Sequence, residues 1–175
     1  MAILDYVWQN MRPRLITSRS VTTAARCHGY PGHLLWLQQH GAVFETSTMA
    51  ALAGRGDLPG MVWLRMQGCP LDERCFAAAV KSGKFKAMWY MMREKCPLAP
   101  VVLKKAKSLS VVKWLREQGC PWDEKTLLRF ILRGHSKIVT WMLKNGCPVD
   151  VEKVKEGEKN YHPLMVKLLQ RKGIL

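Results

Sequence analysis

Apolar residues recur along this chain at helical spacing, in short stretches that are separated by polar and glycine-containing turns. The apolar positions of one stretch return 27 residues later in the next: Val111, Val112, Trp114 and Leu115 correspond to Ile138, Val139, Trp141 and Met142. The pattern predicts pairs of short amphipathic helices joined by tight turns.

Two markers repeat with one period. An aromatic residue followed by Leu or Met occurs at Trp36, Trp63, Tyr90, Trp114 and Trp141. A turn follows each of them: Gly41-Ala42, Gly68-Cys69-Pro70, Lys95-Cys96-Pro97, Gly119-Cys120-Pro121 and Gly146-Cys147-Pro148, with spacings of 27, 27, 24 and 27 residues. The second marker lies seven residues before each aromatic position, at Gly29, Gly56, Gly83, Lys107 and Gly134, and Tyr161 takes this place in the last unit. We infer about six units, one of them shortened by three residues before Lys107.

Each unit is expected to contain two helices. Acidic pairs after the Gly-Cys-Pro turn, such as Asp72-Glu73 and Asp123-Glu124, suit the N-terminus of the first helix. The second helix is expected to begin near Pro31, Pro59 and Pro163 and to end at a glycine. Because such short helices are marginal alone, equivalent side chains of neighbouring units should pack into a continuous core, and we expect the tryptophans in it.

The segments Gly119-Cys-Pro-Trp-Asp-Glu-Lys-Thr126, Gly134-His135, Ile138-Val-Thr-Trp-Met142 and Gly146-Cys-Pro148 resemble the ankyrin repeat. The likeness is to a shortened 27-residue form with Gly-Cys-Pro-Trp-Asp-Glu turns, common in large DNA viruses, algae and protists. The resemblance implies an all-α helix-turn-helix solenoid of about six short repeats over residues 20–175. The first helix of the final repeat, Asp150 to Asn160, is nearly all polar, so we interpret this repeat as the C-terminal cap. The resemblance also implies a protein-binding scaffold without an active site.

The chemically reactive residues have structural explanations. Cys69, Cys96, Cys120 and Cys147 share one repeat position, where Cys replaces the small Ala that remains at Ala42. Their spacing does not match the close cysteine pairs of structural zinc sites, so no metal and no other cofactor is expected. His135 is expected to bond the backbone of its turn. Catalytic and nucleotide-binding motifs are missing from the sequence, so we expect no enzymatic activity and no small-molecule substrate.

Composition adds a question about charge. The chain has 175 residues, enough for one domain, with 48% hydrophobic residues and a net charge of +15. No apolar run is long enough to span a bilayer, so no membrane association is expected. A secretory signal pattern is lacking, so the six cysteines predict reduced thiols and an intracellular, cytoplasmic or nuclear location.

Between Lys81 and Lys137, fourteen basic residues oppose four acidic ones. Some are aligned by the period, just before the turn between the two helices: Arg26, Arg55, Lys81, Lys105, Arg133 and Lys159. The candidate binding face is formed by Arg55, Lys81, Lys84, Lys104, Lys105, Lys107, Arg129 and Arg133.

This face has two interpretations. These cations are partners of helix C-termini on a solvated surface, or they form a positive face for RNA, DNA or an acidic protein. Lys104, Lys105 and Lys107 together exceed what one helix end requires, which favours a polyanionic partner. The predicted function is non-catalytic binding of another macromolecule, with a protein as first choice. The alternative is a basic RNA-associated subunit of a ribonucleoprotein or ribosome, which uses repeats three to five.

Residues 1–19 precede the clear repeats, and residues 6–44 contain no acidic residue. We prefer to interpret these residues as an N-terminal cap or extension of the stack. The same composition also suits an organelle transit segment or a degenerate F-box helix.

Overall fold

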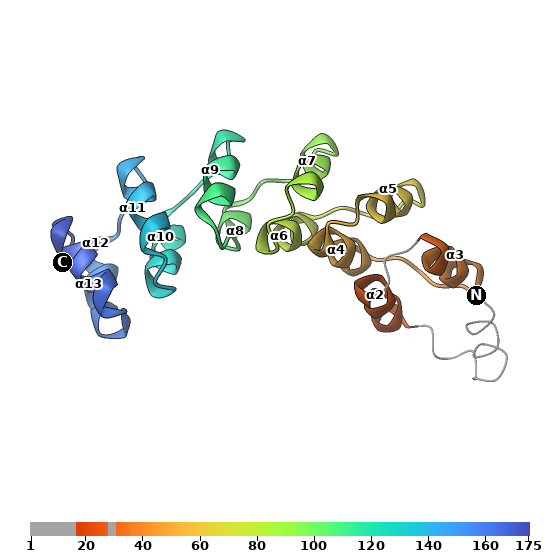
Figure 1. Ribbon diagram of the computed structural model, residues 1–175, viewed down its shortest axis with the longest axis horizontal. Helices are drawn as coiled ribbons and strands as arrows, with labels where there is room; N and C mark the ends of the chain where they lie inside the picture. The colour runs from red at the N-terminus through yellow and green to blue at the C-terminus, as the bar shows by residue number, and fades with distance from the viewer. Residues whose placement is uncertain (1–16, 28–30) are drawn as a thin grey trace. The chain divides into compact units, whose positions relative to one another are not determined.

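The computed structural model describes residues 17–27 and 31–175, and these residues form helices joined by turns, with no strand among them (Figure 1). The prediction of an all-helical chain is therefore confirmed for this part. The predicted cap or extension, residues 1–19, lies outside the described residues except for its last three. The marker Gly29 and the side chain of Arg26 also lie outside the described part. The chain divides into two compact units, residues 1–97 and 98–175, here called the N-terminal and C-terminal units.

The described part of the N-terminal unit holds three helix pairs. The pairs are α2 (Ser18–Cys27) with α3 (Pro31–Gln39), α4 (Thr46–Arg55) with α5 (Leu58–Met66), and α6 (Glu73–Lys81) with α7 (Phe85–Arg93). The first helices pack side by side, α2 on α4 and α4 on α6, and so do the second helices, α3 on α5 and α5 on α7. Each pair thus covers the apolar face of the next.

The C-terminal unit follows the same plan. Its helices are α8 (Pro100–Leu103), α9 (Leu109–Glu117), α10 (Glu124–Leu132), α11 (Ser136–Lys144), α12 (Val151–Glu156), the 3-10 turn η2 (Glu158–Asn160) and α13 (Pro163–Arg171). Helix α10 packs on α8, and α11 packs on both α9 and α13. Prolines at the start of α3 and α13 and at the second position of α5 confirm the predicted starts of the second helices.

The predicted acidic caps are present. The Asp72 carboxylate accepts bonds from the amides of Arg74 and Cys75 at 2.9 and 3.2 Å, and Asp123 accepts from the amide of Thr126 at 2.6 Å. Burial tends to raise the pKa of Asp123, but hydrogen bonds from Thr126 and Lys104 outweigh it and lower the pKa. Each carboxylate therefore satisfies amides that the helix leaves without partners.

At most of the repeated turns a left-handed residue ends the helix, whereas Lys107 and Tyr161 of the second marker do not have a positive φ. Positive φ angles occur after the first helices at Gly56, Gly83 and Gly134, and after the second helices at Gly41, Gly68, Gly119, Gly146 and Gly173. Lys95 takes the same place after α7 with φ of 55° and is the one non-glycine residue with positive φ among those described. A side chain in this region is strained, whereas glycine is not.

The three-residue deletion falls in a first helix. Helix α8 has four residues, whereas its counterparts α6 and α10 have nine each. The second helix α9 keeps the full nine residues. Lys107 takes the place of the glycine after the first helix but does not have a positive φ, so the shortened helix leads into its partner by a different turn.

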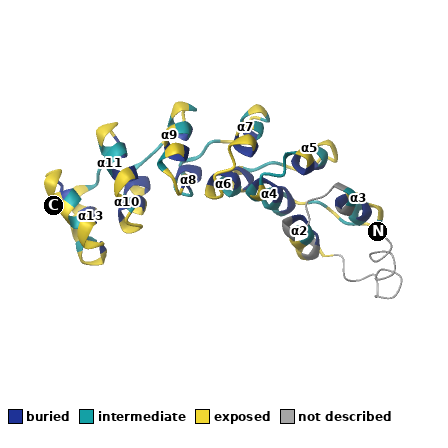
Figure 2. Ribbon diagram, in the orientation of Figure 1, coloured by how far each residue is buried: buried dark blue, intermediate teal, exposed yellow. Residues whose placement is uncertain are grey.

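The tryptophans are less buried than we expected. Trp36 is buried, but Trp63, Trp114 and Trp141 are half-buried. Figure 2 shows that second helices such as α7, α9 and α11 have both buried and exposed parts. Fully buried side chains of the second helices lie at neighbouring positions, among them Met61, Leu64, Met88, Met91, Val112, Leu115, Val139 and Met142. The rings of Trp63 and Trp141 meet Phe44 and Trp122 edge to face at the border of the core.

We expect Lys95→Gly to raise the free energy of unfolding by about 1 kcal/mol, because glycine adopts positive φ without the strain of a Cβ atom. Chemical denaturation followed by circular dichroism measures this change. As a control, Gly119→Ala should lower the free energy of unfolding by a similar amount, since Gly119 has the same backbone conformation (φ 81°) in open space. Equal stability of Lys95→Gly and the wild type would contradict the strain.

Candidate binding surface

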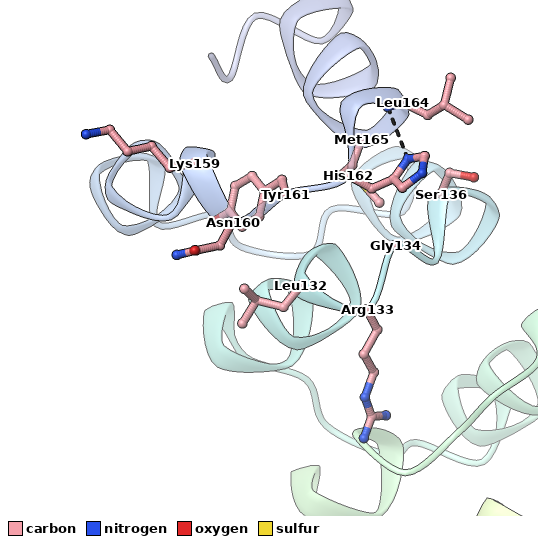
Figure 3. A pocket seen from close by; sticks show the side chains of 10 residues that line it. All are labelled: Leu132, Arg133, Gly134, Ser136, Lys159, Asn160, Tyr161, His162, Leu164 and Met165. Atoms are coloured by element: carbon pink, nitrogen blue, oxygen red, sulfur yellow. Dashed lines mark hydrogen bonds between the residues drawn. The ribbon is translucent and has the colours of Figure 1, made fainter.

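Two adjoining shallow cavities lie along the turns between first and second helices of the C-terminal unit. Figure 3 shows the side chains that line the larger one. The larger, about 600 Å³, is lined by Leu132, Arg133, Gly134, Ser136, Lys159, Asn160, Tyr161, His162, Leu164 and Met165. The smaller, about 360 Å³, is lined by Lys107, Ser108, Leu109, Gly134, His135, Ser136, Lys137 and Ile138. Gly134 and Ser136 belong to both, so we call the pair the turn-side groove.

The lining of the turn-side groove is basic. It includes Lys107, Arg133, Lys137 and Lys159 and no carboxylate. The residues come from three successive turns, because each repeat brings its inter-helix turn to the same side. Leu132 and Leu164 add exposed apolar surface. A positive, partly apolar groove of this kind can bind an anionic partner, and its charge acts at full strength only at low salt.

Arg133 has a structural role as well. Its guanidinium donates to the backbone carbonyl of Lys104 at 2.9 Å, at the C-terminal end of α8. Figure 3 shows this side chain directed away from Lys159 and Tyr161. A cation at a helix C-terminus interacts favourably with the helix dipole, so the charge of Arg133 serves α8 rather than the larger cavity.

Lys104 is paired rather than available. Its ammonium lies 3.2 Å from a carboxylate oxygen of Asp123, the residue that caps α10, and the side chain is only 22% exposed. We counted Lys104 among the excess cations of the shortened unit, and the ion pair with Asp123 removes it from that excess. Lys105 is half-buried, and Lys107 is the exposed member of the three.

The remaining members of the candidate face are divided between the two units. Arg129 is exposed on the last turn of α10 but lines neither cavity. In the N-terminal unit, Arg55 and Lys81 are exposed at the ends of α4 and α6. The stem of Lys84 covers the turn at Gly56, where an added Cβ atom would lie 3.0 Å from its Cδ atom. The side chain of Lys84 therefore reaches the turn that directly follows Arg55.

Two groove residues were not among the candidate residues. Lys159 was aligned with the other basic residues by the period, and that alignment was sufficient to include it. Lys137 lies two residues after the Gly134-His135 turn, so its proximity to an inter-helix turn was also visible in the sequence.

The cysteine column forms links between repeats. Each thiol donates to the carbonyl of the residue that caps the preceding first helix: Cys69 to Glu45, Cys96 to Asp72, Cys120 to Ala99 and Cys147 to Asp123, at 3.2 to 4.0 Å. Burial raises the pKa of the first three thiols to about 11 and that of Cys147 to about 12. These cysteines are therefore neutral donors at physiological pH.

Histidines have local roles in the turns. The ring of His135 lies edge-on to Phe130, with centroids 5.9 Å apart, and makes no cap hydrogen bond, so our expectation that it bonds the turn backbone was wrong. His162 does act as a cap, because its Nδ1 atom accepts from the amide of Leu164 at 3.3 Å. Within residues 17–27 and 31–175, no three His, Cys, Asp or Glu side chains gather where they could hold a metal ion.

No helix in the described part of the chain is both long and apolar enough to cross a membrane. Comparison with models of known protein families and with curated proteins found no match.

The buried thiols should make stability depend on alkaline pH. Their pKa values are raised above the ordinary value of 9.0, so the folded state holds protons that the unfolded state releases above about pH 9. The free energy of unfolding should therefore fall as the pH rises from 9 toward 11, whereas the thiols should not affect it below pH 9. Denaturation at a series of pH values measures this decline.

The matched control replaces all four column cysteines by alanine, the residue at the equivalent position 42. The thiol of Cys75, whose pKa burial raises to about 12, is unchanged in the control, as are all other titrating groups outside the column. A decline between pH 9 and 11 that is equally steep in both proteins would contradict the role of the thiols.

Proposed function

We propose that this protein is a non-catalytic, ankyrin-type helical solenoid that binds another macromolecule, with a protein as the first-choice partner. The observation that carries the proposal is the turn-side groove, where repeated turns place Lys107, Lys137 and Lys159 along one basic surface without an opposing carboxylate in its lining. We expect the partner to present an acidic surface there.

The proposal of a non-catalytic role is supported by what the reactive side chains do. The column cysteines are protonated and donate to backbone carbonyls, and Asp72, Asp123 and Asp150 cap helices. These groups thus have structural tasks that do not require an active site. The repeated turns and the packing of equivalent helices likewise support the ankyrin-type description.

The basic groove also supports a second candidate, an RNA-associated subunit of a ribonucleoprotein or ribosome. Phosphate groups are recognised by lysines of this kind, and such binding weakens steeply with salt. Reduced thiols are consistent with a location inside the cell, in the cytoplasm or nucleus, with an organelle as the alternative.

Charge reversal in the groove tests both candidates. The groove variant is Lys107→Glu, Lys137→Glu and Lys159→Glu. The control is Lys144→Glu, Lys155→Glu and Lys167→Glu, which changes the net charge equally at exposed lysines that do not line the groove. For a protein partner, affinity capture from the native source should survive nuclease treatment, fail with the groove variant and persist with the control.

For the RNA candidate, capture should be lost on nuclease treatment. The slope of log affinity for a labelled single-stranded RNA against log salt should then become about 2 units shallower in the groove variant, since each lost phosphate contact contributes about 0.7. Equal binding of a partner by the groove variant and the control would contradict a role for the groove. Turnover by the purified protein would contradict the non-catalytic proposal.

A further inference from the structure

An apolar strip is exposed on the second helices of the N-terminal unit. Leu35 on α3, Val62 on α5 and Trp89 on α7 occupy one repeat position, 27 residues apart, and their side chains are 45%, 39% and 52% exposed. Met66 and Phe85, also exposed, extend this strip by one turn on α5 and α7. Helices α3, α5 and α7 pack side by side, so the three residues form a row.

The fold itself does not require apolar residues at this position. In the C-terminal unit the equivalent residues are Lys113, Thr140 and Lys167, on helices α9, α11 and α13 of the same length as α5 and α7. These polar residues are exposed or half-buried. Exposed apolar side chains in a consecutive row therefore mark an interaction surface.

The charge beside the strip indicates the nature of the partner. Helices α3, α5 and α7 together carry Arg65, Lys86 and Arg93 and no carboxylate. Arg65 is paired with Glu94, which follows α7, at 2.9 Å, whereas Lys86 and Arg93 are exposed. A partner that combines apolar side chains with acidic flanks complements this surface.

The spacing of the row fits an α-helix. Axes of packed helices lie about 8–10 Å apart, so the strip offers one apolar side chain about every 10 Å. Residues seven apart on a helix are separated by about 10.5 Å along its axis and lie on nearly the same face. A helix laid across α3, α5 and α7 can therefore place one apolar side chain beside each strip residue.

We propose that Leu35, Val62 and Trp89 form the docking site for an amphipathic helix of a partner protein, with apolar residues at seven-residue spacing and acidic flanks. Helices α3, α5 and α7 pack side by side, so the surface that carries the strip has grooves between helices, which side chains of a partner helix can enter and a flat bilayer surface cannot. The proposal rests on the protein being a binding scaffold but concerns a surface separate from the turn-side groove.

The test is selection of binders from a phage-displayed library of 18-residue helix-forming peptides against the full-length protein. Enriched peptides should carry apolar residues seven apart and a net negative charge. Their affinity, measured by fluorescence anisotropy, should fall at least ten-fold for the strip variant Leu35→Lys, Val62→Thr and Trp89→Lys. Added positive charge alone would strengthen the binding of acidic peptides, so a loss isolates the apolar contact.

Controls separate docking from damage to the fold. The strip variant takes lysine and threonine, the residue types that the C-terminal unit has at these positions, and its circular dichroism spectrum should match that of the wild type. If the triple variant does not fold, Val62→Thr and Trp89→Lys are measured singly, and each should weaken binding. Thr140→Val and the groove variant should bind the selected peptides as the wild type does.

Several results would overturn the proposal. Enriched peptides without the seven-residue pattern would do so, and so would equal binding by the wild type and the strip variant. Binding that requires removal of residues 1–16 would assign the strip to the chain's own N-terminal segment. Strip-dependent sedimentation with phosphatidylcholine–phosphatidylserine vesicles would assign it to a membrane. Strip-dependent dimerisation in analytical ultracentrifugation would assign it to a second copy. None of these outcomes bears on the groove, so the two surfaces are tested independently.

Discussion

The structure depends on burial of apolar side chains between successive helix pairs. Each described helix has ten residues or fewer, too few to be stable alone in water. The faces that carry Met61, Leu64, Met88 and Met91 are buried only because the next pair covers them. Caps and left-handed turns fix where each helix begins and ends, and so ensure that the apolar faces of neighbouring pairs coincide. Without this contact between neighbours, turns and caps would have no helices to join.

Local features of this architecture were predictable from the sequence. Proline starts, acidic caps, glycine turns and the three-residue deletion all act over a few residues, and they appear where the periodic pattern places them. The half-burial of Trp63 and Trp141 was not predictable, because the period shows which residues are equivalent but not how deep their position lies. Depth depends on the angle at which neighbouring pairs pack.

The candidate binding residues were less predictable for a related reason. Lys104 and Lys107 are three residues apart, yet one is paired with a capping aspartate and the other is exposed beside a cavity. Arg133 similarly serves the end of α8. Which partner a cation meets depends on the neighbouring repeat, so net charge identified a basic region but not which of its charges can serve a ligand. The apolar strip was visible as Leu35, Val62 and Trp89 at one repeat position against Lys113, Thr140 and Lys167.

The thiol links have a consequence for how such a chain can change. Four repeats each present a thiol to the repeat before them, and the carbonyl that accepts it belongs each time to the N-cap residue of that preceding repeat. Junctions between repeats are therefore interchangeable, so duplication or loss of a whole 27-residue unit leaves matched partners on both sides of the new junction. Gene duplication could lengthen the array in whole repeats, while the exposed positions of each copy diverge separately, as Trp89 and Lys113 have done.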